Sequence, residues 1–512
     1  MQRHFKYAFI NTSFLKIANL LLTTSLFFIC GCTSSELSKN QLRISFSNYP
    51  GTTDPRICGD LISSSLACLL YEGMTRCGPE GVLEFALAQS VDLSDDHLTY
   101  TFHLRPSCWS DGEPVTAFDF ERSWKRVLDP SFPAICPYLF FTIKNGEKSY
   151  KNEISSQEIA ILALDDLTLQ VTLERPTPHF LSLTSFPCFM PAPSHVRPDG
   201  LISNGPFCLK SAKPNAELIL ARNPTYWNSE QIKLEEIQIT IVDCETTALR
   251  MFQRGELDFV GGLTSPLPID SIPEFQDQIQ FAAVPGTTFV AFNMQHSALQ
   301  SQQLRRALSL SIDRDAIVKY VTQMGESPAT RFIPPSLMGD QKELFPTYVP
   351  DQTILQTEEL VLSYATSEIN RKIATVLQEQ WKKRLGIRVR LDPCERQSFR
   401  ERLYHKDYQL ALHFWVAQFQ DPINILERFQ DPSNLKNIPG WYSSRYCELT
   451  RLAQEDLSQR RDCLEQAEEI LCEEMPLAPI YHWSSGWIHH PSLSNVSANS
   501  SGFILFERIV KS

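Results

Sequence analysis

The sequence predicts an α/β protein with more than one domain or lobe. Its 512 residues exceed the usual size of one domain, and its 43% hydrophobic and 21% charged content is typical of a folded globular chain. Amphipathic helices are predicted at 246–254 and 369–385, and each is followed by a glycine and a short strand, at 257–260 and 387–391. A helix, a glycine stop and a strand together indicate an α/β unit.

The N-terminal half alternates strands with helices. A strand is predicted at 42–47 and a helix at 61–72. The segments 94–106 and 164–176 each open on an aspartate pair and then alternate apolar with polar residues, which indicates two hairpin-like strands. We interpret these aspartates as turn residues and not as catalytic carboxylates. Further elements are a helix that Thr116 caps with Asp119 three residues on, and strands at 217–221 and 237–242.

In the C-terminal half the most informative stretch is 407–422, DYQLALHFWVAQFQDP. It starts as an alternating strand and then runs through Trp415 and Ala417 to Gln418, before the turn pair Asp421-Pro422. One interpretation is a buried strand that enters a loop; the other is a strand whose far end faces something other than core. The remaining predicted elements are strands at 288–293, 478–483 and 503–510, and helices at 303–323 and 449–473.

The N-terminus indicates export. Basic residues precede an apolar run at 17–29, which is short for a spanning helix and ends in Ile-Cys-Gly-Cys. This pattern resembles a bacterial lipoprotein lipobox, so we predict a signal peptide at 1–31, lipidation of Cys32 and a lipid-anchored linker at 32–41. The alternative is an uncleaved anchor. Thr33 is not the aspartate that often signals inner-membrane retention, so the lipid anchor could lie in either the inner or the outer membrane of the envelope.

Several classes of function receive no support. The formal charge of −12 argues against nucleic acid as a partner. Phosphate-loop, HExxH, GxSxG and paired-cysteine motifs are missing, so no catalytic residue, cofactor or metal is predicted. The histidines His482, His489 and His490 are interpreted as a solvated surface. The twelve cysteines after Cys32 are scattered, so mostly free thiols are expected, with one or two disulfides at most.

Six ordered blocks of the chain resemble the extracellular solute-binding proteins of peptide ABC importers, the oligopeptide-binding type. The resemblance runs from about Leu42 to the C-terminus. The blocks are DGEPVTAFDFERSWKRVLDP (111–130), LQVTLERPTPHFLSLTSFPCFMP (169–191), NGPFCLKSAKPNAELILARNPTYW (204–227), ALSLSIDRDAIVKYV (307–321), IATVLQEQWKKRLGI (373–387) and EEILCEEMPLAPIYH (468–482).

This resemblance implies an α/β, three-lobed, periplasmic-binding-protein-like fold (type II, cluster C) with a ligand cleft that closes by hinge motion. Lobe I is expected at 42–70, 195–285 and 484–512, lobe II at 71–194, and lobe III at 286–483. The expected protein is a monomer without catalysis. It would capture oligopeptides and deliver them to an ABC permease from a lipid-anchored, periplasm-facing position in the cell envelope. The alternatives are a receptor for another solute, such as a murein-derived peptide, nickel, haem or a sugar oligomer, or an exported hydrolase.

The resemblance also implies a set of ligand-binding residues, which come from the segment before the helix predicted at 61–72, from the stretch 407–422 and from the separate position 396. The set is Cys58, Gly59, Asp60, Arg396, Phe414, Trp415, Val416, Ala417, Gln418 and Asp421.

Three of these positions depart from many relatives. An aspartate that pairs with the peptide α-ammonium is replaced by Gln418, a glutamate by Cys58, and an aromatic residue by Arg396. Because a buried ammonium without a countercharge is costly, either the ligand is not an ordinary free-amine peptide, or Asp60, Glu395 or Asp421 supplies the charge. Arg396 either recognises a ligand carboxylate or points to solvent.

Overall fold

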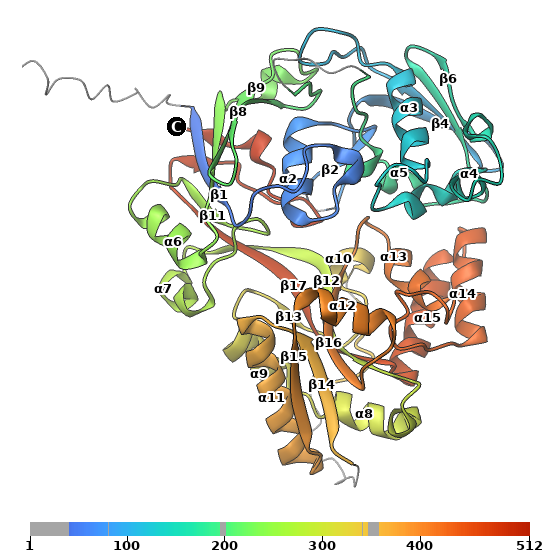
Figure 1. Ribbon diagram of the computed structural model, residues 1–512, viewed down its shortest axis with the longest axis vertical. Helices are drawn as coiled ribbons and strands as arrows, with labels where there is room; N and C mark the ends of the chain where they lie inside the picture. Colours follow the sequence, from blue (N-terminus) through green and yellow to red (C-terminus); the bar gives the residue numbers. More distant parts are fainter. Residues whose placement is uncertain (1–39, 80, 195–200, 340, 347–357) are drawn as a thin grey trace, which may run out of the picture.

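The computed structural model describes residues 40–79, 81–194, 201–339, 341–346 and 358–512 (Figure 1). The predicted signal peptide, Cys32 and most of the linker lie outside these residues. Within the described part, mixed α/β structure is arranged around three main sheets. In Figure 1, two of them lie in the upper half of the molecule and the third extends into the lower half.

The first sheet forms around the N-terminal strand, β1 (Gln41–Phe46). Its order is β1-β10-β9-β8, with β1 parallel to β10 and the other pairs antiparallel. Leu42, Ile44 and Phe46 alternate along β1 and are buried, as the period of two in the sequence predicts. The other strands are β8 (Phe207–Lys213), β9 (Glu217–Arg222) and β10 (Glu236–Ile241).

The second sheet contains the two predicted hairpin-like segments. Its order is β4-β5-β7-β6, and all its pairs are antiparallel. Helix α3 packs against β6 and β7 and begins at Thr116, whose capping box with Asp119 was predicted. The buried Trp124 on α3 donates its indole N–H to the Phe189 carbonyl at 2.7 Å. The strands are β4 (Ala88–Leu93), β5 (Thr99–Leu104), β6 (Ile161–Asp165) and β7 (Thr168–Thr172).

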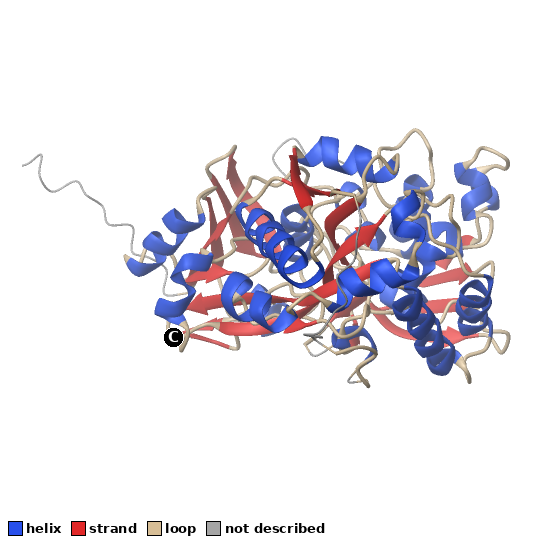
Figure 2. Cartoon of the chain, turned by 90° about the horizontal axis from the view of Figure 1, so that it is seen from below, coloured by secondary structure: helices blue, strands red, loops and turns tan. Residues whose placement is uncertain are grey.

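The third sheet connects the upper and lower halves. Its order is β11-β17-β12-β16-β14-β15, and β13 pairs with β17. Its longest strands, β12 (Gln280–Phe292) and β17 (Leu477–His489), each contain 13 residues. The others are β11 (Phe259–Gly261), β13 (Ser327–Pro328), β14 (Leu360–Ala365), β15 (Val389–Cys394) and β16 (Leu410–Val416). Figure 2, from below, shows long strands that run through the molecule with helices outside them.

Strands β12 and β17 are where the two halves of the molecule are joined. Their pairing changes register between Ala283 and Thr287, next to Pro285 and Gly286. The predicted boundary between lobes I and III falls at this place, inside both strands. Proline removes a ladder donor and glycine adds backbone freedom, so this irregularity is the place in the two strands best suited to bending. The division into three lobes stays a prediction.

The helices agree with the sequence patterns in most cases. Helix α11, the strongest predicted, spans Glu368–Leu385 and ends at Gly386, whose φ of +71° is the left-handed conformation that glycine adopts readily. The other helices are α2 (Leu61–Leu70), α3 (Ala117–Val127), α4 (Gly146–Tyr150), α5 (Phe180–Leu183), α6 (Glu245–Gln253), α7 (Ile272–Phe275), α8 (Gln302–Leu310), α9 (Arg314–Ile317), α10 (Pro335–Met338), α12 (Arg396–Tyr404), α13 (Ile423–Leu426), α14 (Ser444–Glu455) and α15 (Arg460–Glu474).

Several predicted elements were wrong in extent. The strands predicted at 288–293 and 478–483 are parts of the longer β12 and β17. The helix at 303–323 is divided between α8 and α9, because Asp313 caps a new helix by accepting from the Ala316 amide. The helix at 449–473 is divided between α14 and α15, where Asp456 accepts from Ser458 instead of continuing the helix. The strand at 503–510 is mostly loop and a short 3₁₀ turn, and only Val510–Lys511 forms a strand, β19, with β18 (Leu493–Ser494).

The sulfur and histidine predictions had mixed outcomes. All twelve cysteines from Cys58 to Cys472 are described, and all are free. The prediction that most cysteines are free thiols is therefore confirmed, and the one or two disulfides that it allowed are absent from the described chain. His482 is buried and hydrogen bonds Thr287 Oγ1, so its placement on a solvated surface was wrong. The described residues contain no group of three or more side chains suited to a metal ion. Among them, no helix is long and apolar enough to cross a membrane.

Candidate functional site

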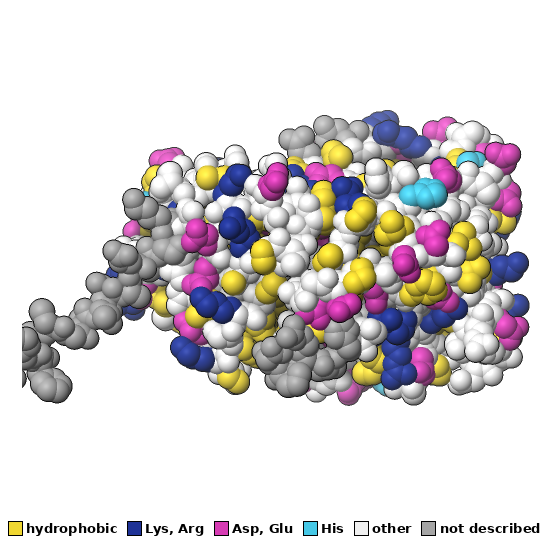
Figure 3. Space-filling model, turned by 90° about the horizontal axis from the view of Figure 1, so that it is seen from above, with side chains coloured by type: hydrophobic (Ala, Val, Ile, Leu, Met, Phe, Trp, Pro, Cys, Tyr) yellow, Lys and Arg dark blue, Asp and Glu magenta, His cyan; other side chains and the backbone are white. Residues whose placement is uncertain are grey.

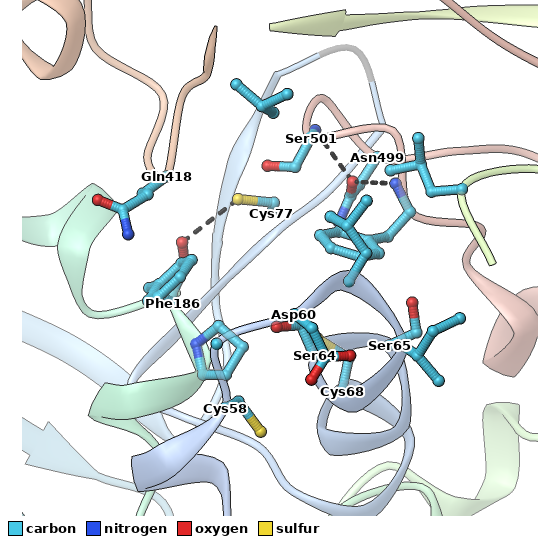
Figure 4. A pocket seen from close by; sticks show the side chains of 18 of the residues that line it. Cys58, Asp60, Ser64, Ser65, Cys68, Cys77, Phe186, Gln418, Asn499 and Ser501 are labelled. Atoms are coloured by element: carbon cyan, nitrogen blue, oxygen red, sulfur yellow. Dashed lines mark hydrogen bonds between the residues drawn. The ribbon is translucent and has the colours of Figure 1, made fainter. Parts of the chain in front are cut away.

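A cavity of about 1090 Å³ lies between the upper and lower halves of the molecule. We call its two sides the α2 wall and the β16 wall. The α2 wall comprises Asp60 to Gly73 with α2, residues 135–138 and 185–190, and the C-terminal loop 499–507. The β16 wall comprises Phe414 to Gln418 with Arg396, Tyr404, Lys436 and Trp483. Figure 4 shows α2 residues Asp60, Ser64 and Cys68 on one side of the space and Gln418 on another.

The end of β16 has one backbone edge without a neighbouring strand. Strand β14 pairs with β16 only from Leu410 to Leu412, whereas β12 pairs with it as far as Val416. The Ala417 amide donates to the Pro285 carbonyl at 2.7 Å, toward β12. Because amide directions alternate along a strand, the N–H and C=O groups of Phe414 and Val416 point to the opposite edge, where β14 has ended. This edge borders the cavity.

Two neighbouring aromatic residues of β16 have different surroundings. The Trp415 ring is 7% exposed and packs in an aromatic cluster, with ring centroids 4.7 Å from Phe289 and 5.4 Å from Phe429. Phe414 is 38% exposed, and its ring lies 4.6 Å from that of Trp483 in the same cavity lining. The suggestion that the strand's far end faces away from core therefore holds for Phe414 and is wrong for the Trp415 ring.

Gln418 contacts the opposite wall. Its Oε1 accepts from the Tyr138 hydroxyl at 2.6 Å, and its Nε2 donates to Cys136 Sγ at 3.4 Å. Its backbone amide donates to Asn424 Oδ1 at 3.0 Å. Burial raises the pKa of both the Cys136 thiol and the Tyr138 hydroxyl, so both groups are neutral. Gln418 thus joins the two walls through neutral hydrogen bonds.

Two cations lie near Gln418. Lys436 lines the cavity, and its Nζ is 3.6 Å from the centroid of the Tyr138 ring. The buried Arg428 lies over the Trp415 ring at 4.8 Å and donates to the Asn424 carbonyl. Burial, followed by the charge of Arg428, lowers the pKa of Lys436 to about 8. Cation–π contacts offset part of the cost of burying these charges.

The segment before α2 forms the facing part of the cavity. Asp60 caps α2, accepting from the Ser63 amide at 2.9 Å and from the Ser63 hydroxyl at 2.7 Å. Gly59 approaches Ile135 so closely that a Cβ would lie 2.3 Å from Ile135 Cδ1. The Cys58 thiol donates to the Asp54 and Ser63 carbonyls, and burial raises its pKa. Cys58 is therefore a neutral, internally bonded group.

The acidic residues of the cavity lie on the α2 wall. Besides Asp60 they are Glu72 and Glu507. Glu72 is held by Arg76 and by the Trp227 indole, which donates to it at 2.6 Å. Glu507 lies 3.7 Å from Arg508, which is also paired with Glu84. Burial raises the pKa of the Glu507 carboxyl.

The predicted ligand-binding residues divide into two groups. Cys58, Gly59, Asp60, Arg396 and Phe414 to Gln418 line the cavity, with Arg396 exposed at the start of α12. Asp421 does not line it, because both its carboxylate oxygens accept from Arg460. Glu395, a proposed countercharge, caps α12 and also lies outside the lining. Asp60 is therefore the one proposed countercharge that borders the cavity.

Sequence reasoning missed part of the lining. It did not find Tyr138, Lys436, Trp483 or Glu507, or the loop that holds Asn499 and Ser501. In that loop Asn499 Oδ1 accepts from the amides of Ser501 and Phe503 (Figure 4). One signal was available: Trp483 ends the predicted strand 478–483 as Trp415 ends another. The remaining residues follow from tertiary packing and carry no local signal.

A cavity between two halves that two long strands join is an arrangement typical of proteins that close around a ligand by hinge motion. The profile of the bacterial extracellular solute-binding proteins, family 5, matches residues 83–437 of this chain. The chain belongs to this family, and its predicted periplasmic-binding-protein-like fold is confirmed.

Named relatives extend the comparison over more than nine-tenths of the chain. The oligopeptide-binding protein OppA of Bacillus subtilis is 33% identical over 504 residues, which cover 91% of this chain and 92% of that protein. The periplasmic murein peptide-binding protein MppA of Escherichia coli is 26% identical, over 92% and 93% of the two chains.

Solved structures of related binding proteins share the fold of this chain. A periplasmic oligopeptide-binding protein from Borrelia burgdorferi is 27% identical, with a TM-score of 0.78, and the match covers 92% of this chain and 100% of that chain. The murein tripeptide-binding protein MppA of Escherichia coli is 26% identical with a TM-score of 0.77, and the coverage is 93% and 99%.

Proposed function

We propose that this protein captures oligopeptides in the cavity between its two walls and delivers them to an ABC permease, without catalysis of its own. The observation that carries the proposal is the free edge of β16. Phe414 and Val416 direct backbone donors and acceptors toward the cavity. An extended peptide can add to such an edge as a further strand. The relatives named as peptide-binding proteins support the same conclusion.

Backbone pairing suits a broad range of peptides. Each hydrogen bond between backbones contributes roughly 0.5–1.5 kcal/mol net, whatever the side chains are. The cavity of about 1090 Å³ leaves room for side chains and for bridging water. The exposed Phe414 and its neighbour Trp483 offer an apolar surface beside the free edge.

The cellular setting is also a proposal. A lipid-modified Cys32 would hold the protein on the periplasmic side of the cell envelope, and residues 33–41 would link it to β1. Figure 3 shows acidic and basic side chains interspersed over one face, without a concentrated basic patch on that face. We expect a monomer whose membrane partners are the lipid bilayer and the permease.

The neutral Gln418 makes the ligand's amino terminus the first question. Gln418 already bonds Tyr138 and Cys136, so it supplies no countercharge for an α-ammonium group. Asp60 is the cavity-lining carboxylate among the three proposed replacements, and Arg396 is positioned to meet a ligand carboxylate at the rim. Calorimetry with free and N-acetylated forms of one peptide tests this. A large loss of affinity on acetylation would show that a free amine is still recognised.

Mass spectrometry of ligands that copurify with the protein from its native envelope tests the main proposal. We expect intact peptides of several sequences. Purified protein incubated with a peptide mixture should then retain intact peptides and release no fragments. Cleavage of the mixture, or recovery of non-peptide solutes alone, would contradict peptide capture.

A further inference from the structure

Lys436 is a cation inside the cavity without an acidic partner. Its Nζ contacts the face of the Tyr138 ring at 3.6 Å, and its backbone amide is held by Asn434 Oδ1 at 2.9 Å. Across the described residues, no carboxylate forms an ion pair with it. Its neighbour Arg428 is also without an ion pair there, since its guanidinium donates to the Asn424 carbonyl. Two unneutralised cations therefore lie beside Gln418.

The nearest acidic groups do not balance these charges. Asp421 is engaged by Arg460 through both of its oxygens. Glu427 interacts electrostatically with both Arg428 and Lys436, but it forms an ion pair with neither among the described residues and does not line the cavity, and burial raises the pKa of its carboxyl, which disfavours the charged form. The polar groups that do face Lys436 from the other wall, the Tyr138 hydroxyl and the Cys136 thiol, are neutral.

A partly buried ammonium group that lacks a countercharge costs free energy. A ligand that brings a negative group to Lys436 removes that cost, whereas a ligand that brings an α-ammonium group there adds repulsion. Gln418 and Tyr138 cannot supply the negative group, because each is neutral and already bonded to the other. The missing charge must therefore come with the ligand.

The geometry points to a carboxylate subsite at Lys436, beside Gln418 and Tyr138, that binds a carboxylate of the captured peptide. This assignment rests on the proposed peptide-binding function and specifies which ligand group this end of the cavity takes. The carboxylate is the peptide's C-terminus or an acidic side chain, since both present the same group to the ammonium.

Matched peptides distinguish these two sources. Calorimetry would compare a peptide found in the copurified pool with its C-terminal amide and with a form whose Glu and Asp residues are Gln and Asn. We expect one of the two changes to weaken binding by about 10- to 100-fold, as for truncation of one member of a partly desolvated charge pair. Weaker binding of the amide would identify the C-terminus as the source of the carboxylate. Weaker binding of the Gln/Asn form would identify an acidic side chain. Equal affinity for all three forms would overturn the subsite.

Two variants assign the effect to Lys436. In Lys436→Met the wild-type preference for the carboxylate form should disappear, and Lys436→Arg should restore most of it. Lys406→Met is the matched control, because Lys406 is also desolvated and without an ion pair in the described chain but lies outside the lining. If Arg396→Gln removes the preference and Lys436→Met does not, the carboxylate binds at the rim and the assignment to Lys436 is wrong.

The pH dependence gives a second measurement. Carboxylate binding favours the charged ammonium, and the pKa of Lys436 in the free protein is about 8. Affinity should be constant near pH 7 and about tenfold weaker at pH 9, and Lys436→Met should lose this dependence. In this range Arg428 stays charged, while Tyr138 and Cys136 stay neutral because burial raises their pKa values. An affinity that does not change between pH 7 and pH 9 would contradict the subsite.

The two proposals fail in different ways. If no peptide of any form binds, peptide capture itself is wrong. If peptides bind but their carboxylates have no effect on affinity, peptide capture stands and the Lys436 subsite is wrong.

Discussion

The two walls of the cavity carry opposite charge. The α2 wall holds the acids Asp60, Glu72 and Glu507, with Arg76 paired to Glu72, whereas the lining residues of the β16 wall include Arg396 and Lys436 and no acid. The walls meet through a neutral contact, in which Tyr138 bonds Gln418, and just outside the lining His179 stacks on Phe419 with ring centroids 4.8 Å apart. The charges that complement the two walls must therefore come from the ligand. On our proposal, a peptide would place its ammonium group toward the acidic α2 wall and its carboxylate toward the basic β16 wall.

The largest effect should come from the two faces of β16. Trp415→Ala should lower the free energy of unfolding by about 3–5 kcal/mol, because it empties an aromatic cluster around a buried ring. Phe414→Ala, one residue away, should change stability by less than about 1 kcal/mol, since Phe414 is 38% exposed, yet it should weaken peptide binding. Denaturant unfolding and calorimetry measure both. Similar destabilisation by the two variants would show that β16 does not present one face to core and one to ligand.

The next effect concerns the place where the walls meet. Burial lowers the pKa of His179 to about 4, so this histidine is neutral in the folded protein. Its unfolded pKa is near 6.5, so the unfolded chain binds more protons between pH 6.5 and pH 4, and stability falls as the pH falls through that window. His179 alone should contribute a loss of up to about 2 kcal/mol between pH 7 and pH 5.

His179→Phe provides the control. It keeps the stack on Phe419, and the His179 Nδ1 has no hydrogen-bond partner to lose. Its melting temperature should fall less between pH 7 and pH 5 than that of the wild type. An equal fall would assign the acid sensitivity to other histidines, such as the partly buried His413 and the buried His482, whose pKa values are also lowered by desolvation.

A smaller effect tests the acidic wall. Glu507→Gln should weaken binding of a lysine-containing peptide by about three- to tenfold, because a ligand cation beside this loosely paired carboxyl favours its charged form against the effect of burial, which raises its pKa. The norleucine form of the same peptide should be affected less. Asp60→Asn is a matched variant, since asparagine caps a helix as well as aspartate does and the change removes charge without removing the cap. If neither variant loses affinity for the lysine-containing peptide, the α2 wall does not recognise a cation.

A comparably small effect should come from Tyr138→Phe. This variant removes the hydrogen bond to Gln418 but keeps the ring under Lys436. We expect peptide affinity to change by about 0.5–1.5 kcal/mol, the net value of one neutral hydrogen bond. Calorimetry measures it, and a much larger loss would mean that the hydroxyl contacts the ligand directly.

Local chemistry explains which parts of the fold were predictable. Thr116 and Asp119 form a capping box from a four-residue pattern, and Gly386 ends α11 because it adopts a positive φ. Asp313 and Asp456 broke two predicted helices for the same kind of reason, since short acidic side chains bond nearby backbone amides. The helical spacing of apolar residues continues across both interruptions, so the sequence pattern predicted one helix where the structure has two.

The candidate site was predictable only in part. Phe414 to Gln418 follow from a strand pattern together with the family resemblance. Asp421 looked equally suitable, but Arg460, 39 positions away, occupies its carboxylate. Lys436 and Glu507 reach the cavity from loops far apart in the sequence, and no periodicity marks them. Side chains that become partners only through tertiary packing leave no local pattern to read.

The sheet that joins the two halves also determines when folding can finish. Strand β17 lies between β11 and β12, yet it is made of residues 477–489, nearly 200 positions after β12 begins. Until those residues have been synthesised, β12 lacks its partner strand on one side, and the part of the cavity lining that Trp483 provides is missing. Long-range pairing of this kind forms slowly. The central sheet, and with it the cavity wall that carries Trp483, therefore cannot be completed until residues 477–489 have left the ribosome.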